Sequence, residues 1–158
     1  MTDARFEDGD ESPLRLVAQA PDDVPVISAL VQDAVFPATE MRFDAKRRQF
    51  ALLVNRFRWE DRGRAERQGR PYERVQSMLV VNDALSVASS GIDRGDAEMV
   101  LSLLSLDFAP GADGVGTLTM TLAGDGAIRV DVECLDLVLR DVTRPYVAPS
   151  GKAPAHRD

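Results

Sequence analysis

Nearly every segment after Pro37 alternates apolar with polar residues, and this period of two constrains the fold more than any other feature of the sequence. Such alternation is typical of strands that bury one face. In the clearest case, segments 117–122 and 127–133 both alternate and flank the turn formed by Gly124, Asp125 and Gly126. A glycine-rich turn between two alternating segments predicts an antiparallel hairpin. We therefore expect a mainly antiparallel sheet.

One segment, near the N-terminus, has helical periodicity instead. Residues 14–19 alternate and predict a short first strand, after which Asp22 is the expected N-cap of a helix. Five apolar residues then recur at spacings of three and four, which places them on one stripe of that helix. They are Val24, Ile27, Leu30, Val31 and Ala34. Pro37 is expected to end the helix, because its ring disfavours a helical conformation in the preceding residue.

Three of the expected strands change register along their length. In segment 49–60 the apolar residues move from even to odd positions, which predicts a bulge near Asn55. Segment 98–108 shows a similar change after Leu103, and predicts a second bulge. After Cys134 the register shifts again, so the strand there either kinks and continues or gives way to a new one.

These patterns predict an α+β fold with about eight strands and one N-terminal helix after the first strand. Because successive strands usually pair and bulges curve a sheet, we expect a mainly antiparallel, strongly curved sheet or a partly open β-barrel, with the helix packed on an open face or end. A flat two-layer sandwich is the alternative.

The 158 residues fit one domain. We place it at 13–142, between an acidic tail at 1–12 and a proline-containing tail at 143–158, both expected to be disordered.

The sequence holds one histidine, His156, and one cysteine, Cys134. A catalytic triad, a Cys-His dyad or a histidine-rich zinc site needs an imidazole held rigidly in a pocket, which a terminal tail does not provide. We therefore expect no catalytic residue, no cofactor and no metal ligand, and we expect Cys134 to be a buried small hydrophobe. The sequence has neither a secretory signal nor a membrane-spanning run, so we expect a soluble cytoplasmic protein without membrane contact.

Positive charge is concentrated in one window of an acidic chain. Residues 42–74 contain 11 basic and 5 acidic residues, whereas the whole chain has a net charge of -7. Such segregation predicts a face that attracts anionic partners. We expect residues 60–74 to form a glycine-punctuated polar loop. The expected partner-binding residues are Arg56, Arg58, Trp59, Arg62, Arg64, Arg67, Arg70 and Tyr72.

Three interpretations of this window remain open. The arginines either form a solvated loop that pairs with the acidic body, bind an acidic protein or an anionic small ligand, or grip RNA with help from the aromatic residues. A sequence pI near 4.7 disfavours nucleic acid. The leading hypothesis is a small non-catalytic module that binds a protein or anionic ligand. A homodimer is compatible with the sequence.

The alternative from another class is a metal-dependent enzyme that uses carboxylates near Asp131 and Glu133. Asp136 and Asp141 continue the same acidic row. Two converging carboxylates can perform acid–base catalysis or hold a divalent cation. Their alternation with apolar residues favours a solvated strand face instead. The glycine-rich segment 111–116 is expected to be a hairpin connection, because no helix follows it.

Several local strings carry a family resemblance. Segments 26–35, 48–60, 91–94 and 127–134 together resemble a small proteobacterial family known as domain of unknown function 2948. The resemblance spans about 14–141, which is nearly the whole expected domain. It implies no activity, so no residue role is transferred from it.

Overall fold

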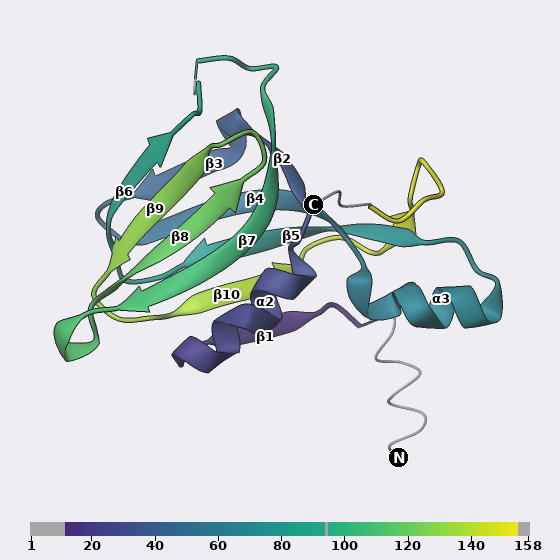
Figure 1. Cartoon of the computed structure of the whole chain (residues 1–158), viewed down its shortest axis with the longest axis horizontal. Coiled ribbons are helices and arrows are strands. Elements are labelled where there is room, and N and C mark those ends of the chain that lie inside the picture. Colours follow the sequence, from purple (N-terminus) through teal and green to yellow (C-terminus); the bar gives the residue numbers. More distant parts are fainter. Residues whose placement is uncertain (1–11, 94, 155–158) are drawn as a thin grey trace.

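The computed structural model describes residues 12–93 and 95–154, and over these residues the chain forms one open sheet of eleven strands with two short α-helices (Figure 1). The strands are β1 (Arg15–Ala18), β2 (Val35–Pro37), β3 (Met41–Asp44), β4 (Gln49–Phe57), β5 (Glu73–Val81), β6 (Ala84–Ser90), β7 (Val100–Pro110), β8 (Gly116–Leu122), β9 (Ala127–Val132), β10 (Leu137–Asp141) and β11 (Tyr146–Val147). The helices are α2 (Val24–Leu30) and α3 (Arg62–Gln68), with single 3-10 turns η1 (Pro21–Asp23), η2 (Ala38–Glu40), η3 (Trp59–Asp61) and η4 (Ala112–Gly114).

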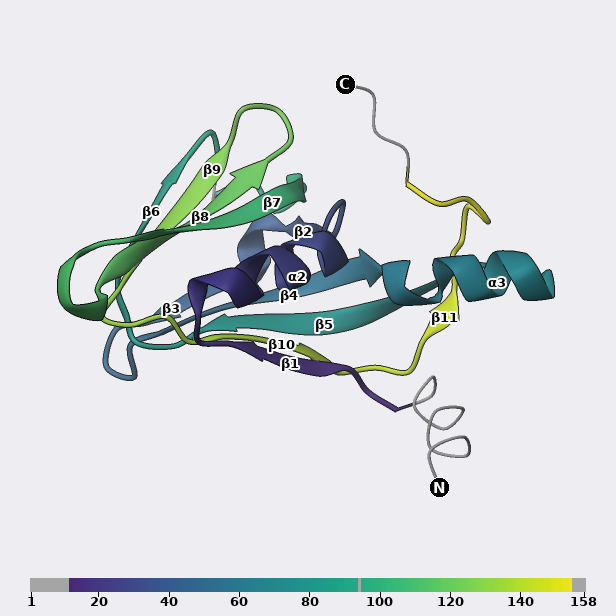
Figure 2. The same cartoon turned by 60° about the horizontal axis from the view of Figure 1, so that its bottom comes forward.

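The sheet is antiparallel throughout and follows the order β1-β10-β5-β4-β2-β7-β8-β9-β6, with β3 added to β4 and β11 added to β5. It does not close, because β1 and β6 lie at its two ends. The sheet curls strongly, so that β7 and β8 lie across from β4 and β5 with α2 between them (Figure 2). The α+β antiparallel class is confirmed. Eight strands was too few, because β2, β3 and β11 are too short to show an alternating pattern.

The core fills the concave side of the sheet. Leu52, Leu79 and Leu139 are direct cross-strand neighbours on β4, β5 and β10, and all three have no exposed surface. Cross-strand apolar neighbours of this kind are the basic unit of sheet stability. From α2, the side chains of Val24 and Ile27 enter the same core. The predicted helical stripe is therefore buried as expected, apart from the half-buried Leu30.

The helix itself is shorter than its apolar stripe. It ends at Leu30, and Asp33 then adopts a positive φ of 64° that turns the chain into β2. The expectation of a helix running to Pro37 was wrong, because Pro37 ends a strand that pairs with β7. Asp22 does not cap α2 either. It lies in η1, and the residue before α2 is Asp23, whose carboxylate accepts the Ala20 N–H at 3.3 Å.

One of the two predicted bulges is present. The register of β7 against β8 shifts between Leu103 and Ser105, as expected. The bulge near Asn55 was wrong, because β4 pairs with β5 without interruption from Phe50 to Phe57. The apolar pattern breaks there because Arg56 occupies the core-facing position, while Phe57 is fully buried on the other face. After Cys134 a new strand, β10, begins.

Residues 60–74 are not a loop, contrary to expectation. They contain the end of η3 and the whole of α3, which ends at Gly69 in the left-handed conformation with φ of 64°. Glycine adopts this conformation without steric cost, and it commonly ends helices. Only Ala65 of α3 is buried, so no apolar stripe marked this helix in the sequence.

The sheet extends beyond the expected domain boundary at residue 142. Tyr146 and Val147 form β11 against the start of β5. Ala148 is buried, and its N–H donates to the backbone carbonyl of Tyr72. The expected acidic tail at 1–12 lies almost entirely outside the described residues, as does the end of the C-terminal tail with His156. No described helix has both the length and the apolar character needed to cross a membrane.

We predict that Leu79→Ala lowers the free energy of unfolding by about 2–5 kcal/mol, because it leaves a cavity at the centre of the core. The matched control is Leu85→Ala on β6, whose side chain is 45% exposed. That change should cost no more than about 0.5 kcal/mol. Urea unfolding followed by the fluorescence of the single tryptophan, Trp59, measures both. Equal losses in the two variants would contradict the placement of Leu79 in the core.

Candidate functional site

The basic window 42–74 does not form one face, which corrects the expectation of a single positive surface. Strand β4 carries it across the molecule, with the β3–β4 turn at one end and α3 at the other (Figure 1). A nine-residue strand spans about 30 Å. Arg42, Lys46, Arg47 and Arg48 lie exposed at the turn end. The eight expected partner-binding residues all lie at the α3 end.

Arg56 is the centre of a buried ion network at this end. Its side chain has no exposed surface. Both terminal nitrogens donate to the Glu60 carboxylate at 2.8 Å, and Nη2 also donates to Asp141 Oδ1 at 3.0 Å. Its Nε donates to Ser77 Oγ at 3.0 Å, and that hydroxyl donates to Asp141 Oδ1 at 2.7 Å. With the Phe57 carbonyl accepting from Nη1 at 3.5 Å, every N–H of the guanidinium has an acceptor.

Glu60 and Arg56 stay charged in this network. Burial by itself would raise the Glu60 pKa, but the hydrogen bond and the positive charge of Arg56 outweigh it and hold that pKa below its ordinary value of 4.5. Burial by itself would also lower the Arg56 pKa, yet the bonds and charges of Glu60 and Asp141 raise it. A buried ion pair of this kind is maintained only when its remaining polar atoms are also bonded. Here Asp141 Oδ2 accepts the Leu14 N–H at 3.1 Å.

A second set of ion pairs fixes the base of α3. Arg58 is 7% exposed, and its Nη1 donates to Glu73 and lies 3.8 Å from Asp61. The Asp61 carboxylate in turn accepts from both terminal nitrogens of Arg70, at 3.2 and 3.0 Å. Asp61 is only 5% exposed, so this two-bond contact holds the C-terminal end of α3 against its N-terminal end.

Aromatic rings fill the space between α3 and the strands. The buried ring of Phe57 makes edge-to-face contacts with Trp59 and Tyr72, at 4.7 and 5.5 Å between ring centroids. Trp59 donates its indole N–H to the Gln32 carbonyl at 2.9 Å, while the guanidinium of Arg62 lies 5.9 Å above its ring. The Tyr72 hydroxyl donates to Glu66, which raises the Tyr72 pKa. Both rings therefore bridge α3 to the rest of the fold.

The structure divides the expected partner-binding residues into two groups. The first group makes internal contacts: Arg56, Arg58, Trp59, Arg70 and Tyr72. The second group lies on α3: Arg62, Arg64 and Arg67. Arg62 is 48% exposed, pairs with Glu66 at 3.3 Å and lies over the Trp59 ring, and Arg67 is exposed. Surface pairs of this kind contribute little to stability, so these side chains can change partners.

Sequence reasoning missed the acidic half of this site. Asp141 was assigned to a solvated row of carboxylates, and that was wrong, because only 5% of its side chain is exposed. The signal was present in the sequence. Asp141 follows Leu137 and Leu139 at spacings of two, which is the core-facing register of β10. Ser77 occupies the matching position on β5, directly opposite Asp141.

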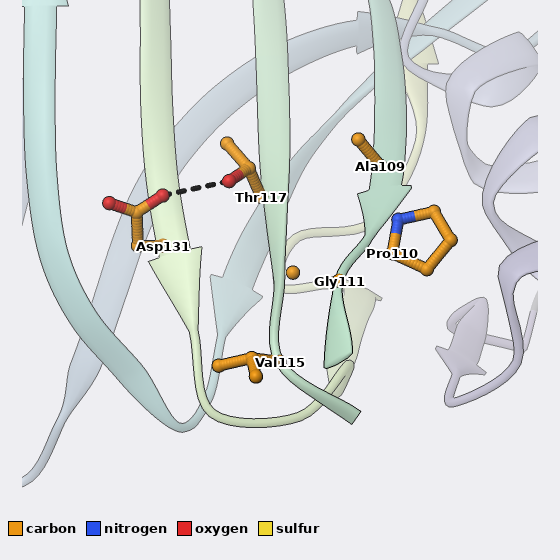
Figure 3. Close-up of a pocket in the computed structure, with 7 residues that line it drawn as sticks. Ala109, Pro110, Gly111, Val115, Thr117 and Asp131 are labelled. Atoms are coloured by element: carbon orange, nitrogen blue, oxygen red, sulfur yellow. Dashed lines mark hydrogen bonds between the residues drawn. The ribbon is translucent and has the colours of Figure 1, made fainter. Parts of the chain in front are cut away.

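The other carboxylates are bound to separate partners. Asp131 accepts from Thr117 Oγ1 at 2.8 Å and from Ser86 Oγ at 3.1 Å, whereas Glu133 pairs with Arg48 at 2.7 Å. Asp131 lies at a shallow depression of about 420 Å³ beside the β7–β8 hairpin (Figure 3). That hairpin includes segment 111–116, as expected. Within the described ranges, no three histidine, cysteine or acidic side chains are close enough to share a metal ion.

Cys134 is exposed, so its expected burial was wrong. Its thiol donates to Asp83 Oδ2 at 3.1 Å, and this bond to a carboxylate raises the Cys134 pKa. A raised pKa keeps the sulfur protonated and poorly nucleophilic at neutral pH.

The chain belongs to the family described as "Protein of unknown function (DUF2948)", whose sequence profile matches residues 14–156. The match confirms the resemblance seen in the local strings, and it extends past β11. Neither the curated proteins nor the solved structures yield a match. The function must therefore be argued from the geometry of the α3 end.

We predict that Arg56→Met lowers the free energy of unfolding by about 3–5 kcal/mol, because it leaves Asp141 without its counter-charge and Glu60 with only the longer contact to Arg58. Arg62→Met is the matched control, since Arg62 also pairs with a glutamate but is exposed. That control should cost no more than about 1 kcal/mol. Urea is the suitable denaturant, because guanidinium chloride would screen the pairs. A loss below 1 kcal/mol in Arg56→Met would show that the network contributes nothing net.

The Glu60 pKa predicts a pH dependence. Because it is lower in the folded protein than its ordinary value of 4.5, ionised Glu60 stabilises the fold above that pH, and the contribution disappears as pH falls through the folded pKa. We expect the stability difference between the wild type and Glu60→Gln to shrink between about pH 6 and pH 3. Glu98→Gln, an exposed change of equal charge, is the control. A difference that stays constant over this range would contradict the assignment.

Proposed function

We propose that the protein is a non-catalytic binding module, that α3 is its docking element, and that its partner is an acidic surface of another protein. The observation that supports this proposal is the position of α3 in the fold. It lies beyond the ends of β4 and β5, apart from α2 and the curled part of the sheet (Figures 1 and 2). Internal carboxylates bind the arginines at its base, while Arg62 and Arg67 lie at the surface.

The length of this connection supports a functional role. Strands β4 and β5 are antiparallel neighbours, which a turn of about two to five residues can join. The chain instead uses residues 58–72, with a helix of seven residues. Isolated helices shorter than about 12–15 residues are marginal in water, so α3 depends on its contacts with the body. A costly element that the sheet does not need is a reasonable binding element.

The charges favour an acidic protein over a nucleic acid. The exposed arginines of α3 offer complementarity to carboxylates, and the acidic remainder of the chain directs an anionic partner towards this end. The same remainder repels a long nucleic acid that extends past α3, since the net charge is -7, whereas a short acidic segment contacts α3 alone. A carboxylate of the partner can replace Glu66 as the acceptor for Arg62, because that exposed pair is weak. The metal-dependent alternative has less support, as Asp131 and Glu133 already have separate partners.

We test the proposal with a short poly-glutamate peptide as the acidic probe, chosen so that it can contact α3 alone, and measure fluorescence anisotropy at low ionic strength. The triple variant Arg62→Ser, Arg64→Ser, Arg67→Ser should lose about tenfold or more in affinity, because charged contacts at the docking surface are removed. The matched control removes the same charge from the other end of β4, as Arg42→Ser, Lys46→Ser, Arg47→Ser. It should retain binding. Affinity of the wild type should fall as salt approaches about 0.15 M.

Two outcomes would contradict the proposal. Equal losses in both triple variants would mean that the probe responds to net charge and not to α3. Unchanged binding in the α3 variant, with its fold intact by circular dichroism, would place any binding surface elsewhere.

A further inference from the structure

Arg74 differs from the other arginines with little exposure. Arg56, Arg58 and Arg70 each form an ion pair with a carboxylate. Arg74 is half-buried on β5, yet among residues 12–93 and 95–154 no carboxylate forms an ion pair with it. Burial lowers the Arg74 pKa, and electrostatic interactions with Tyr146 and Asp33 oppose this. A guanidinium nevertheless remains charged at neutral pH.

The acceptors that Arg74 does have are uncharged. Its Nε donates to the side-chain carbonyl of Asn55 at 2.6 Å, and its Nη2 donates to the Asn55 backbone carbonyl at 3.0 Å. These bonds use two of the five N–H groups of a guanidinium. The other three have no acceptor among the described residues. A planar guanidinium with N–H groups that lack acceptors matches the geometry of a carboxylate or phosphate group.

A second donor lies beside it. Tyr146 of β11 is the direct cross-strand neighbour of Arg74. The Tyr146 hydroxyl oxygen accepts from Asn55 Nδ2, so its own proton remains available to an acceptor. Asn55 thus holds both side chains, one through its carbonyl and one through its amide. The short strand β11 returns the chain to β5 at this point and presents the phenol next to the guanidinium.

We propose that Arg74 and Tyr146 form a binding site for a small oxyanion, either a carboxylate or a phosphate group. A half-buried cation without a contacting counter-charge loses hydration that neutral acceptors replace only in part. A bound oxyanion supplies the missing charge and accepts the unused N–H and O–H groups. The site lies on β5 and β11, so it goes beyond the docking role of α3 and does not depend on it.

Amide NMR titration of the wild-type protein locates the site. Sodium phosphate and sodium acetate are added in separate experiments, with sodium chloride at matched ionic strength as the reference. We expect the backbone amides of Asn55, Arg74 and Tyr146 to shift saturably with a single Kd for phosphate, acetate or both. The comparison of the two anions identifies the preferred group. Shifts equal to those with chloride, or confined to α3, would overturn the proposal.

Two variants test the roles of the donors. Arg74→Gln should lower the affinity about tenfold to a hundredfold, because it removes charge-assisted hydrogen bonds. Tyr146→Phe should lower it by a smaller factor, about tenfold or less, because one hydroxyl is lost. Arg62→Gln, an exposed arginine on α3, is the control and should bind as the wild type does. Wild-type affinity in Arg74→Gln would overturn the proposal.

The two proposals fail separately. Loss of poly-glutamate binding in the α3 triple variant, with phosphate or acetate still shifting Arg74, supports both. Saturable shifts at Arg74 without any effect of the α3 variant on poly-glutamate would remove only the docking role. If Arg74→Gln does not fold, the wild-type titration and Tyr146→Phe still decide the oxyanion site.

Discussion

The structure depends on a guanidinium at the end of its core. Arg56 takes the core-facing position that an apolar residue holds elsewhere on β4, and it is fully buried there. Strands β4 and β10 end here beside the middle of β5, and Arg56, Ser77 and Asp141 join the three strands. Because Glu60 takes part in the same network, the chain leaving β4 is fixed in direction before α3 begins. Removing Arg56 or Asp141 leaves the buried charge of the other without full compensation, which costs more than the intact network contributes.

From this point, ion pairs and the aromatic rings beside them position α3. Glu60 lies between Arg56 and Arg58, at 2.8 and 3.7 Å, and Asp61 lies between Arg58 and Arg70, at 3.8 and 3.0 Å. The result is a row of alternating charges from the buried interior to the surface, accompanied by the rings of Phe57, Trp59 and Tyr72. The inner members are protected from salt by burial and the outer ones are not. The placement of α3 is consequently firm at its base and more easily adjusted at its exposed face.

Alternation and helical spacing predicted the parts of the fold in which burial follows one simple period. Strands such as β8 and β9, and the apolar stripe of α2, were found for this reason. The prediction failed where a polar residue occupies a core-facing position. The break in the apolar pattern at Arg56 was interpreted as a change of register, and Asp141 was assigned to a solvent-exposed strand face. Both residues in fact continue the inward-facing positions of their strands. Helix α3 was missed because it buries only Ala65, and charge counting did not reveal that β4 separates the two basic clusters. Arg74 and Tyr146, the two side chains proposed to bind an oxyanion, become neighbours only because β11 pairs with β5. A strand of two residues is too short to show an alternating pattern in the sequence.

The bond between Arg56 and Asp141 joins residues 85 positions apart, and this separation has a consequence during synthesis. At about 5–20 residues per second, a ribosome takes roughly 4–17 s to add that stretch. During this interval β4 has emerged without its acidic partner, and β1 has emerged without β10, the strand with which it pairs. The edge of β5 that pairs with β10 therefore stays open until β10 is made, and Arg56 lacks the counter-charge of Asp141 over the same interval. One late strand, β10, thus supplies both the missing sheet partner and the missing carboxylate.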